Sequence, residues 1–269
     1  MTTAILQPLT PALVLAGVSG LMIGSFLNVV VHRVPRDESL IRPGSRCPGC
    51  GAAVRIWQNV PVASWVVLRG RCAGCGTRIS VRYPLVELGT AGLFVAVTAR
   101  FGVGWVLPAY LYLAAVAVAL ALIDLDVQRL PNRIVLPSYL VGSVLLLGAA
   151  IAEHDWSAAG RALAAMTVLY AGYWTVAYLY PDGMGLGDVK LAGLLGLYLG
   201  WLGWSSVWIG TLTGFLLGGV AGVALLVTRR ATGRTPIPFG PAMLAGALVA
   251  VFAAAPVASW YGSLLSPIA

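Results

Sequence analysis

Four cysteines form two pairs whose spacing is typical of a metal site. They read Cys47-Pro-Gly-Cys50 and Cys72-Ala-Gly-Cys75, and the chain has no other cysteine. Each CxxC turn directs two thiolates toward one point, and two such turns about 20 residues apart complete the tetrahedron of a four-cysteine zinc site. Four protein ligands leave no open coordination position, so we expect a structural zinc that helps its loop to fold. Disulfides or redox-active thiols are the alternative, but the reducing cytosol favours metal.

Acidic residues are scarce, and three aspartates lie where apolar runs begin or end. Asp124 and Asp126 close one run, and Asp188 opens another. Ionisable groups at membrane level are costly and by default mark function. Two carboxylates that approach closely cannot both ionise easily, so such a pair shares a proton. One can then act as general base toward water and the other as general acid, as in aspartic proteases.

Only one of Asp124 and Asp126 is expected to meet Asp188, because residues two apart on a helix face different directions. Asp124 directly follows the apolar run, whereas Asp126 lies closer to Arg129 and water. We therefore expect Asp124 to be the buried partner. The alternative is that these aspartates are interfacial charges paired with Arg129 and Lys190, and for Asp126 alone this alternative is favoured.

The segment before Asp188 is rich in glycine. Gly183, Gly185 and Gly187 precede it without a helical rationale, since glycine disfavours helix interiors. Such a run lets the backbone approach a bound extended peptide closely, although an ordinary flexible loop has the same composition. We expect Gly185, Gly187, Lys190 and Asp126 to support a substrate beside Asp188.

The elements that must position these residues are membrane helices. Hydrophobic residues make up 59% of the chain and charged residues only 10%, against about 25% charged residues in a soluble domain. The composition predicts an all-α polytopic membrane protein embedded in a lipid bilayer, and it argues against nucleic-acid binding despite the net charge of +8. Runs of about 20 apolar residues suffice to span a bilayer. About eight transmembrane helices are predicted, at 11–31, 84–100, 105–123, 137–152, 160–180, 191–205, 206–228 and 239–262.

The basic residues set the orientation of these spans. With the N-terminus outside, alternation places fifteen of the seventeen Lys and Arg residues on one side, including those of loop 32–83 and the cluster Arg229, Arg230 and Arg234. Basic residues in short loops stay in the cytoplasm. The sequence therefore predicts a first helix over 1–31, retained rather than cleaved, a cytoplasmic four-cysteine loop domain over 32–83, and a helical bundle over 84–269.

Taken together, these segments resemble the bacterial prepilin peptidase family, also called type IV leader peptidases. The resemblance runs over nearly the whole chain, and the joint order of its motifs is more specific than any one of them. The matching motifs are Gly24-Ser-Phe-Leu-Asn28, His32-Arg-Val-Pro35, the two CxxC pairs, Ile79 to Leu88, Ile123-Asp-Leu-Asp126 with Leu130-Pro-Asn132, Gly183 to Leu191, and Pro236-Ile-Pro-Phe-Gly-Pro241.

The resemblance implies an aspartic endopeptidase of the bacterial inner membrane that cuts type IV prepilins and pseudopilins after a glycine on the cytoplasmic side. The family's catalytic aspartates fall on Asp124 and Asp188. This agrees with the expectation above that Asp124, rather than Asp126, is the buried aspartate. Many members also methylate the new N-terminus with S-adenosylmethionine, an activity that accompanies the cysteine loop. Glu87 matches a glutamate implicated in that second reaction, and Asn28 and Arg33, in the first-span motifs, are the other methyltransferase candidates.

Three alternatives remain open at this stage. A proton- or ion-coupled transporter predicts paired repeats or helices broken in mid-membrane, and neither is visible in the sequence. A non-catalytic scaffold of a secretion system, docking partners through the zinc loop, would tolerate the loss of both aspartates. A presenilin-like GxGD protease would lack the cysteine loop.

Overall fold

The computed structural model of the chain describes residues 9–181, 183–228 and 238–265, and these residues are almost entirely helical. The all-α prediction is confirmed, because the described ranges contain two isolated bridges and no β-strand. Each of the eight expected apolar runs contains one long helix. The helices are α2 (Leu9–Arg33), α4 (Arg82–Phe101), α5 (Leu107–Val127), α6 (Asn132–Glu153), α7 (Trp156–Leu179), α8 (Leu186–Leu202), α9 (Trp204–Val227) and α10 (Gly240–Leu265).

Six of these helices are long and apolar enough to cross a membrane, which makes the chain a multi-pass membrane protein. The other two are α8, which has 17 residues, and α10, which counts as a shorter apolar helix over Gly240–Ala254. The exact number of eight spans therefore stays a prediction. The basic cluster Arg229, Arg230 and Arg234 and the motif residues Pro236 and Ile237 lie outside the described residues.

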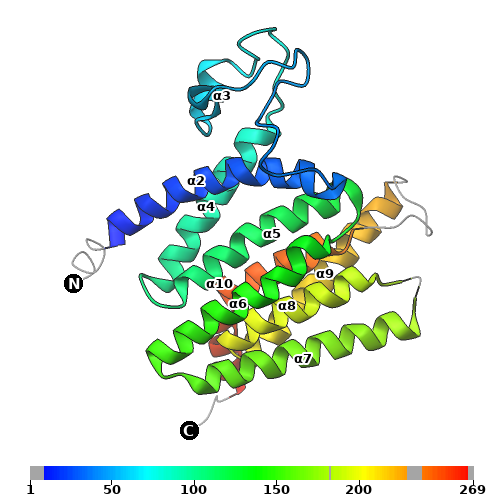
Figure 1. Ribbon diagram of the computed structural model, residues 1–269. Helices are drawn as coiled ribbons and strands as arrows, with labels where there is room; N and C mark the ends of the chain where they lie inside the picture. The colour runs from blue at the N-terminus through cyan, green and yellow to red at the C-terminus, as the bar shows by residue number, and fades with distance from the viewer. Residues whose placement is uncertain (1–8, 182, 229–237, 266–269) are drawn as a thin grey trace. The chain divides into compact units, whose positions relative to one another are not determined.

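The chain forms two compact units, Met1–Ala119 and Leu120–Ala269. In the first unit α2 packs against α4 (Figure 1). A Cβ atom on Gly20 would lie 2.6 Å from the Cα of Ala91, and one on Gly24 would lie 2.7 Å from the Cα of Glu87. Two glycines four residues apart thus let the helix backbones touch, as is common between membrane helices.

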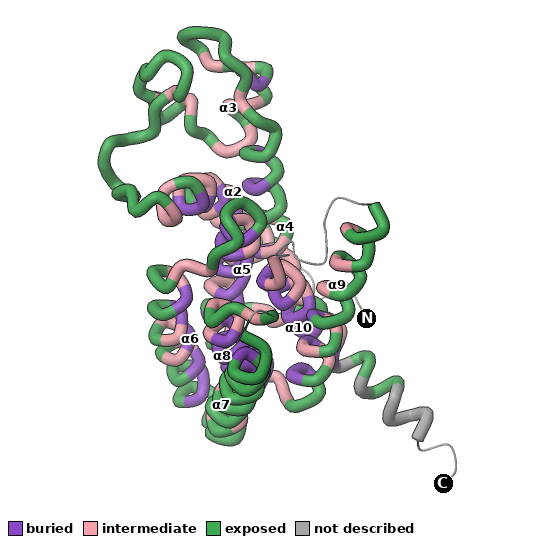
Figure 2. The backbone as a smooth tube through the Cα atoms, turned by 90° about the vertical axis from the view of Figure 1, so that its right-hand side faces the viewer, coloured by how far each residue is buried: buried purple, intermediate pink, exposed green. Residues whose placement is uncertain are grey.

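The segment between α2 and α4 has little core. It contains the short helices η1 (Val34–Arg36), η2 (Ile56–Asn59) and α3 (Ala63–Val67), none of which has a buried residue. Figure 2 shows this segment largely exposed. Its fold therefore depends on local turns and on specific polar contacts rather than on apolar burial.

The core of the second unit is α8. Every residue from Leu191 to Trp201 is buried, and α7 packs along it (Figure 1). Cβ atoms on Gly196 and Gly200 would lie 2.6 Å from the carbonyl oxygen of Ala165 and 2.5 Å from its Cβ. The glycines of this short helix therefore serve close helix packing. Arg161 of α7 donates to the carbonyl oxygens of Gly200 and Trp201 and caps the end of α8.

Two helix boundaries differ from the sequence estimate in ways that affect the aspartates. The third span was expected to end at residue 123, but α5 continues to Val127, so Asp124 and Asp126 both lie on a helix. The sixth span was expected to begin at residue 191, but α8 begins at Leu186, which places Asp188 in its first turn. Negative charge near a helix N-terminus is stabilised by the helix dipole, which favours the earlier start.

We expect Gly196→Ala to destabilise the second unit. The added methyl group would press on the α7 backbone, and overpacking of this kind costs about 1–3 kcal/mol. Gly172→Ala is the matched control, because a Cβ at that helical position meets nothing within 4 Å. Thermal melting of the detergent-purified variants measures both. A melting temperature for Gly196→Ala equal to that of wild type would contradict the close α7–α8 packing.

Candidate active site

Asp124 lies in the last full turn of α5, and its side chain is only 5% exposed. Its Oδ2 atom accepts a hydrogen bond of 3.1 Å from the backbone N–H of Gly240, the first residue of α10. Asp126, two residues further on, is exposed. The structure therefore selects Asp124 as the buried aspartate, as the helical geometry predicts.

Asp188 is partly buried in the first turn of α8, where Gly185 is the N-cap residue. A Cβ atom on Gly185 would lie 3.4 Å from Oδ2 of Asp188, so the glycine leaves space beside the carboxylate. The Asp188 and Asp124 carboxylates are close enough to interact electrostatically. No direct hydrogen bond joins them within the described residues. The structure thus places the two aspartates that the sequence paired within electrostatic range of each other.

Leu130 fills the space between the helix ends that carry this pair. A Cβ atom on Gly187 would lie 3.2 Å from the Cβ of Leu130, and one on Gly240 would lie 3.3 Å from its Cδ2. The same atom on Gly240 would come within 2.7 Å of Oδ2 of Asp124. A side chain at 240 would thus clash with Asp124 and press on Leu130, whereas one at 187 would press on Leu130 alone.

Gly240 and Leu130 are site residues whose contacts the sequence analysis missed. The motif Pro236 to Pro241 was treated as the start of the last helix, and Leu130 as part of a Leu-Pro-Asn sequence. Nothing in local sequence shows that a backbone N–H will meet an aspartate 116 residues away. A glycine between an aromatic residue and a proline was the available signal.

Lys190 does not pair with an aspartate among the described residues. Its Nζ atom donates to the side-chain oxygen of Asn132 at 3.0 Å, which ties the start of α6 to the second turn of α8. The alternative that Lys190 neutralises an interfacial Asp188 is therefore not what the structure shows. Its long stem instead carries the ammonium group to the polar end of α6.

The four cysteines come together as their spacing predicts. Their sulfur atoms all lie within 4.8 Å of one another, and the sulfurs of Cys47 and Cys75 are 3.7 Å apart. Tetrahedral zinc with bonds of about 2.3 Å places its sulfurs about 3.8 Å apart. All four thiols are free. The cluster could therefore bind a metal ion, and the disulfide alternative finds no support in the structure.

The two cysteine turns repeat the same backbone pattern. Cys47 and Cys72 each accept, through their carbonyl oxygens, a hydrogen bond from a glycine four residues later, Gly51 at 2.8 Å and Gly76 at 2.9 Å. Both glycines have positive φ values, +69° and +71°, which glycine adopts without steric cost. Hydrogen bonding to Thr77, its hydroxyl first, lowers the pKa of Cys75 to about 6. Thr77 therefore favours the thiolate of Cys75, which is the form that binds metal.

The three methyltransferase candidates lie in the first unit and make different contacts. Asn28 donates to the carbonyl oxygen of Tyr83 at 3.3 Å and so links α2 to the start of α4. Glu87, one turn further along α4, is buried and accepts the backbone N–H of Val62 at 2.7 Å. Arg33 instead donates to two carbonyl oxygens of the following loop. Asn28 and Glu87 thus share the α2–α4 contact, whereas Arg33 orders the loop entry.

The Glu87 contact holds an unusual backbone in place. Val62 has φ 59° and ψ −51° at the N-cap of α3, and positive φ is a genuine outlier for a β-branched residue. Such strain costs about 1–3 kcal/mol and persists only when the surroundings enforce it. A buried carboxylate bonded to the strained residue therefore anchors the cysteine loop to α4, a role for which the sequence gives no signal.

The fold and these sites define a class: a polytopic helical membrane protein with a carboxylate pair at its helix ends and a separate four-cysteine cluster. Residues 18–101 match the family model of the bacterial peptidase A24 N-terminal domain, and residues 111–261 match that of the type IV leader peptidase family. No solved structure shows a significant match to the chain.

Curated relatives agree with the family models. The chain is 40% identical over 268 residues to a prepilin leader peptidase/N-methyltransferase of Aeromonas hydrophila, covering 90% of each chain. It is 37% identical over 265 residues to the protein of the same name in Stutzerimonas stutzeri, covering 87% of this chain and 88% of that one. The chain therefore belongs to the type IV leader peptidase family, and it is a membrane peptidase.

We expect loss of the Glu87 carboxylate to loosen the cysteine loop. In Glu87→Ala the Val62 N–H loses its acceptor, so trypsin should cut the arginine-rich segment 34–81 several times faster, whereas Glu87→Gln keeps an acceptor oxygen and much of the protection. Glu38→Ala, an exposed change in the same segment, is the control. Equal cleavage rates in wild type and Glu87→Ala, measured by limited proteolysis, would rule out the anchoring role.

Proposed function

We propose that this protein is the endopeptidase that removes the leader peptide from type IV prepilins, with Asp124 and Asp188 as its catalytic residues. The observation that supports the proposal is that the carboxylates of Asp124 on α5 and Asp188 on α8 are within electrostatic range of each other, while a backbone N–H of α10 bonds to Asp124. The relatives are named for the same activity. Pseudopilins, which share the substrate class that the resemblance implies, are further expected substrates.

The two aspartates divide the work of hydrolysis. The Gly240 N–H stabilises negative charge on Asp124, because hydrogen bonds to a carboxylate are among the stronger ones. Asp124 therefore suits the general base, which takes a proton from water as the water oxygen bonds to the scissile carbonyl carbon. Asp188 suits the general acid and gives its proton to the leaving nitrogen as the C–N bond breaks. The products are a carboxylic acid and a free amine.

Gly185 provides the surface along which a substrate backbone can lie, because it borders the Asp188 carboxylate without a side chain of its own. Gly187 contributes differently, because Leu130 packs where a Gly187 side chain would lie. Lys190 supports the site through Asn132, and Asp126 remains an exposed residue at its edge.

The contacts between helix ends fit an orientation with the site in the cytoplasm and the N-terminus outside. Asp124 near the end of α5 meets the start of α10, and Leu130 just after α5 meets the start of α8. Eight alternating spans place these three ends on one side of the membrane, the side of the basic loops. The same alternation places Arg161 and the end of α8 on the other side, where they bond to each other. We therefore propose insertion in the bacterial inner membrane.

We propose a second activity, N-methylation of the new terminus, for which S-adenosylmethionine would supply the methyl group. Glu87 bonds Val62 through Oε2, so its other oxygen remains for an ammonium group, either of the cofactor or of the substrate. Asn28 would hold α2 against the start of α4, which carries Glu87, and Arg33 would hold the beginning of the loop against α2. The cysteine cluster would hold a structural zinc that gives the loop its shape.

Replacement of either catalytic aspartate should abolish cleavage. We expect Asp124→Asn and Asp188→Asn each to lower the rate of prepilin cleavage by about 10²- to 10⁴-fold, the usual contribution of a general acid or base. Asp126→Asn is the matched control and should keep most of the activity. Cleavage of a purified prepilin, followed by the mobility shift of the product, provides the measurement. Full activity in either buried-aspartate variant would defeat the two-aspartate mechanism.

The purified protein should contain about one zinc ion per chain, as a single four-thiolate site predicts. Cys72→Ser should lose most of it, since three thiolates bind zinc less tightly than four. Ser45→Ala, a change in the same loop outside the cluster, should retain it. Elemental analysis gives the metal content, and unchanged zinc in Cys72→Ser would show that the cluster is not the site.

A further inference from the structure

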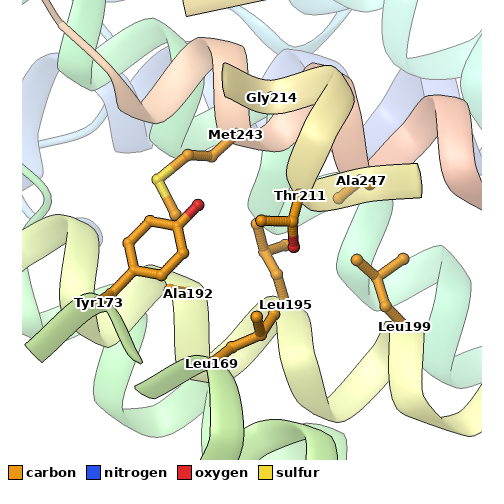
Figure 3. Close-up of a pocket in the computed structure, with 10 residues that line it drawn as sticks. Leu169, Tyr173, Ala192, Leu195, Leu199, Thr211, Gly214, Met243 and Ala247 are labelled. Carbon is orange, nitrogen blue, oxygen red and sulfur yellow. The ribbon is translucent and has the colours of Figure 1, made fainter. Parts of the chain in front are cut away.

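A ligand larger than water does not fit the cavity among α7, α8, α9 and α10 of the second unit, which Figure 3 shows between the helices. Its volume is about 10 Å³, close to the smallest space that accepts one water molecule. The first unit offers a binding surface of another kind. Its cysteine loop, residues 34–81, carries large apolar side chains on the short helices η2 and α3, and Figure 2 shows the loop largely exposed.

The helices η2 and α3 lie in contact with each other. On them and between them, five large apolar residues are exposed, with Ile56 93% and Val67 76% accessible. These five residues are called the apolar surface of the loop: Ile56, Trp57, Val60, Val66 and Val67. Apolar residues gathered in this way on an exposed segment mark an interaction site.

The two tryptophans of the loop differ in their surroundings. The Trp65 ring covers Gly70, where a Cβ atom would lie 2.8 Å from it, and its indole N–H donates to the carbonyl oxygen of Ile79 at 3.2 Å. Trp57 is 56% exposed and makes no hydrogen bond within the described residues. An exposed tryptophan suits the bilayer interface, because its ring can meet hydrocarbon while its N–H meets lipid head groups.

One hydrogen bond places this surface close to the membrane. Val62, the N-cap residue of α3, donates to Glu87 of α4 at 2.7 Å. The apolar helix α4 has 20 residues, so it is about 30 Å long, the thickness of the hydrocarbon core of a bilayer. Glu87 lies five residues after the start of this helix at Arg82, which is about 7–8 Å along its axis. The segment that joins η2 to α3 is therefore anchored at the level of the lipid rather than in the water beyond it.

The charge of the loop complements the phosphate groups of lipids. Six arginines and no acidic residue lie between Ser39 and Val81. These arginines outnumber the four cysteines, so the segment is positive even when every thiol is ionised. Arg55 and Arg69, on either side of the apolar surface in the sequence, are both exposed. An arginine at an interface covers hydrocarbon with its stem and keeps its guanidinium group at the level of the phosphates.

We propose that the apolar surface of the loop inserts into the bilayer interface around α4, with Arg55 and Arg69 bonded to anionic lipid phosphates. The cysteine loop then lies on the membrane instead of standing free in water. Lipid is favoured over a protein partner, because Val62 is held at the level of the lipid and the arginines match its phosphates. The inference needs only that α4 spans the membrane, so it stands apart from the proposed cleavage reaction.

The test is photo-crosslinking of the full chain in vesicles of phosphatidylcholine and phosphatidylglycerol. The photoreactive residue benzoylphenylalanine replaces Trp57 or Val67 of the apolar surface, or Ala73, an exposed residue between Cys72 and Cys75, as the control. Mass spectrometry should find phospholipid adducts at positions 57 and 67 in several-fold higher yield than at position 73. Equal yields at positions 57 and 73 would overturn the insertion, as would crosslinks from position 57 to a second copy of the chain in place of lipid.

Two double variants separate the apolar contribution from the charged one. Ile56→Asp/Val67→Asp should lower the lipid adduct at position 57 several-fold, because a carboxylate resists entry into hydrocarbon, whereas Ala73→Asp should leave it unchanged. An unchanged adduct yield in Ile56→Asp/Val67→Asp would overturn the insertion.

The phosphate contacts have a readout of their own. Among the adducts at position 57, phosphatidylglycerol should be enriched about fivefold over its share of the vesicle lipid, as one basic residue near an anionic surface implies. Arg55→Gln/Arg69→Gln should keep the adducts and lose the enrichment. Enrichment that persists in this double variant would refute the proposed contacts of the two arginines.

Discussion

The hydrogen bond from the Gly240 N–H to Asp124 is the interaction on which the second unit depends. A carboxylate inside an apolar bundle needs a donor that stays in place, and a backbone N–H at the start of a helix has no rotamer to lose. The bond requires glycine, because a side chain at 240 would come within 2.7 Å of the carboxylate oxygen. It also requires that the end of α5 and the start of α10 meet, which constrains every helix between them.

Those helices can meet only because small residues let their backbones approach. A bilayer gives apolar helices no hydrophobic reason to associate, so packing and polar contacts must hold them together. Gly196 and Gly200 let α8 pack against the backbone of α7. Arg161 of α7 donates hydrogen bonds to the last carbonyl oxygens of α8. A helix of 17 residues is adequate here because other helices, rather than lipid, surround it. The rigid α8 that results fixes Asp188 relative to its neighbours.

The sequence predicts the helices well because their cause is local. Apolar runs give all eight helices, and helical geometry correctly separates buried Asp124 from exposed Asp126. The boundaries near the aspartates are less predictable, since Gly185 as N-cap and the continuation of α5 to Val127 depend on caps and on packing partners. Contacts such as Gly240 to Asp124 and Glu87 to Val62 could not be predicted, because they join residues that share no sequence pattern.

The contact between Glu87 and Val62 changes how loss of activity at this glutamate should be interpreted. A glutamate that touches a cofactor and a glutamate that holds a loop in shape both appear essential when activity alone is measured. Here one oxygen of Glu87 already has a structural partner, the strained backbone N–H of Val62 in the cysteine loop. The loop itself has almost no apolar core, so it relies on the cysteine cluster and on polar contacts such as this one. Any methyltransferase chemistry performed by the loop would therefore depend on Glu87 through its position, even where the carboxylate makes no contact with the methyl donor.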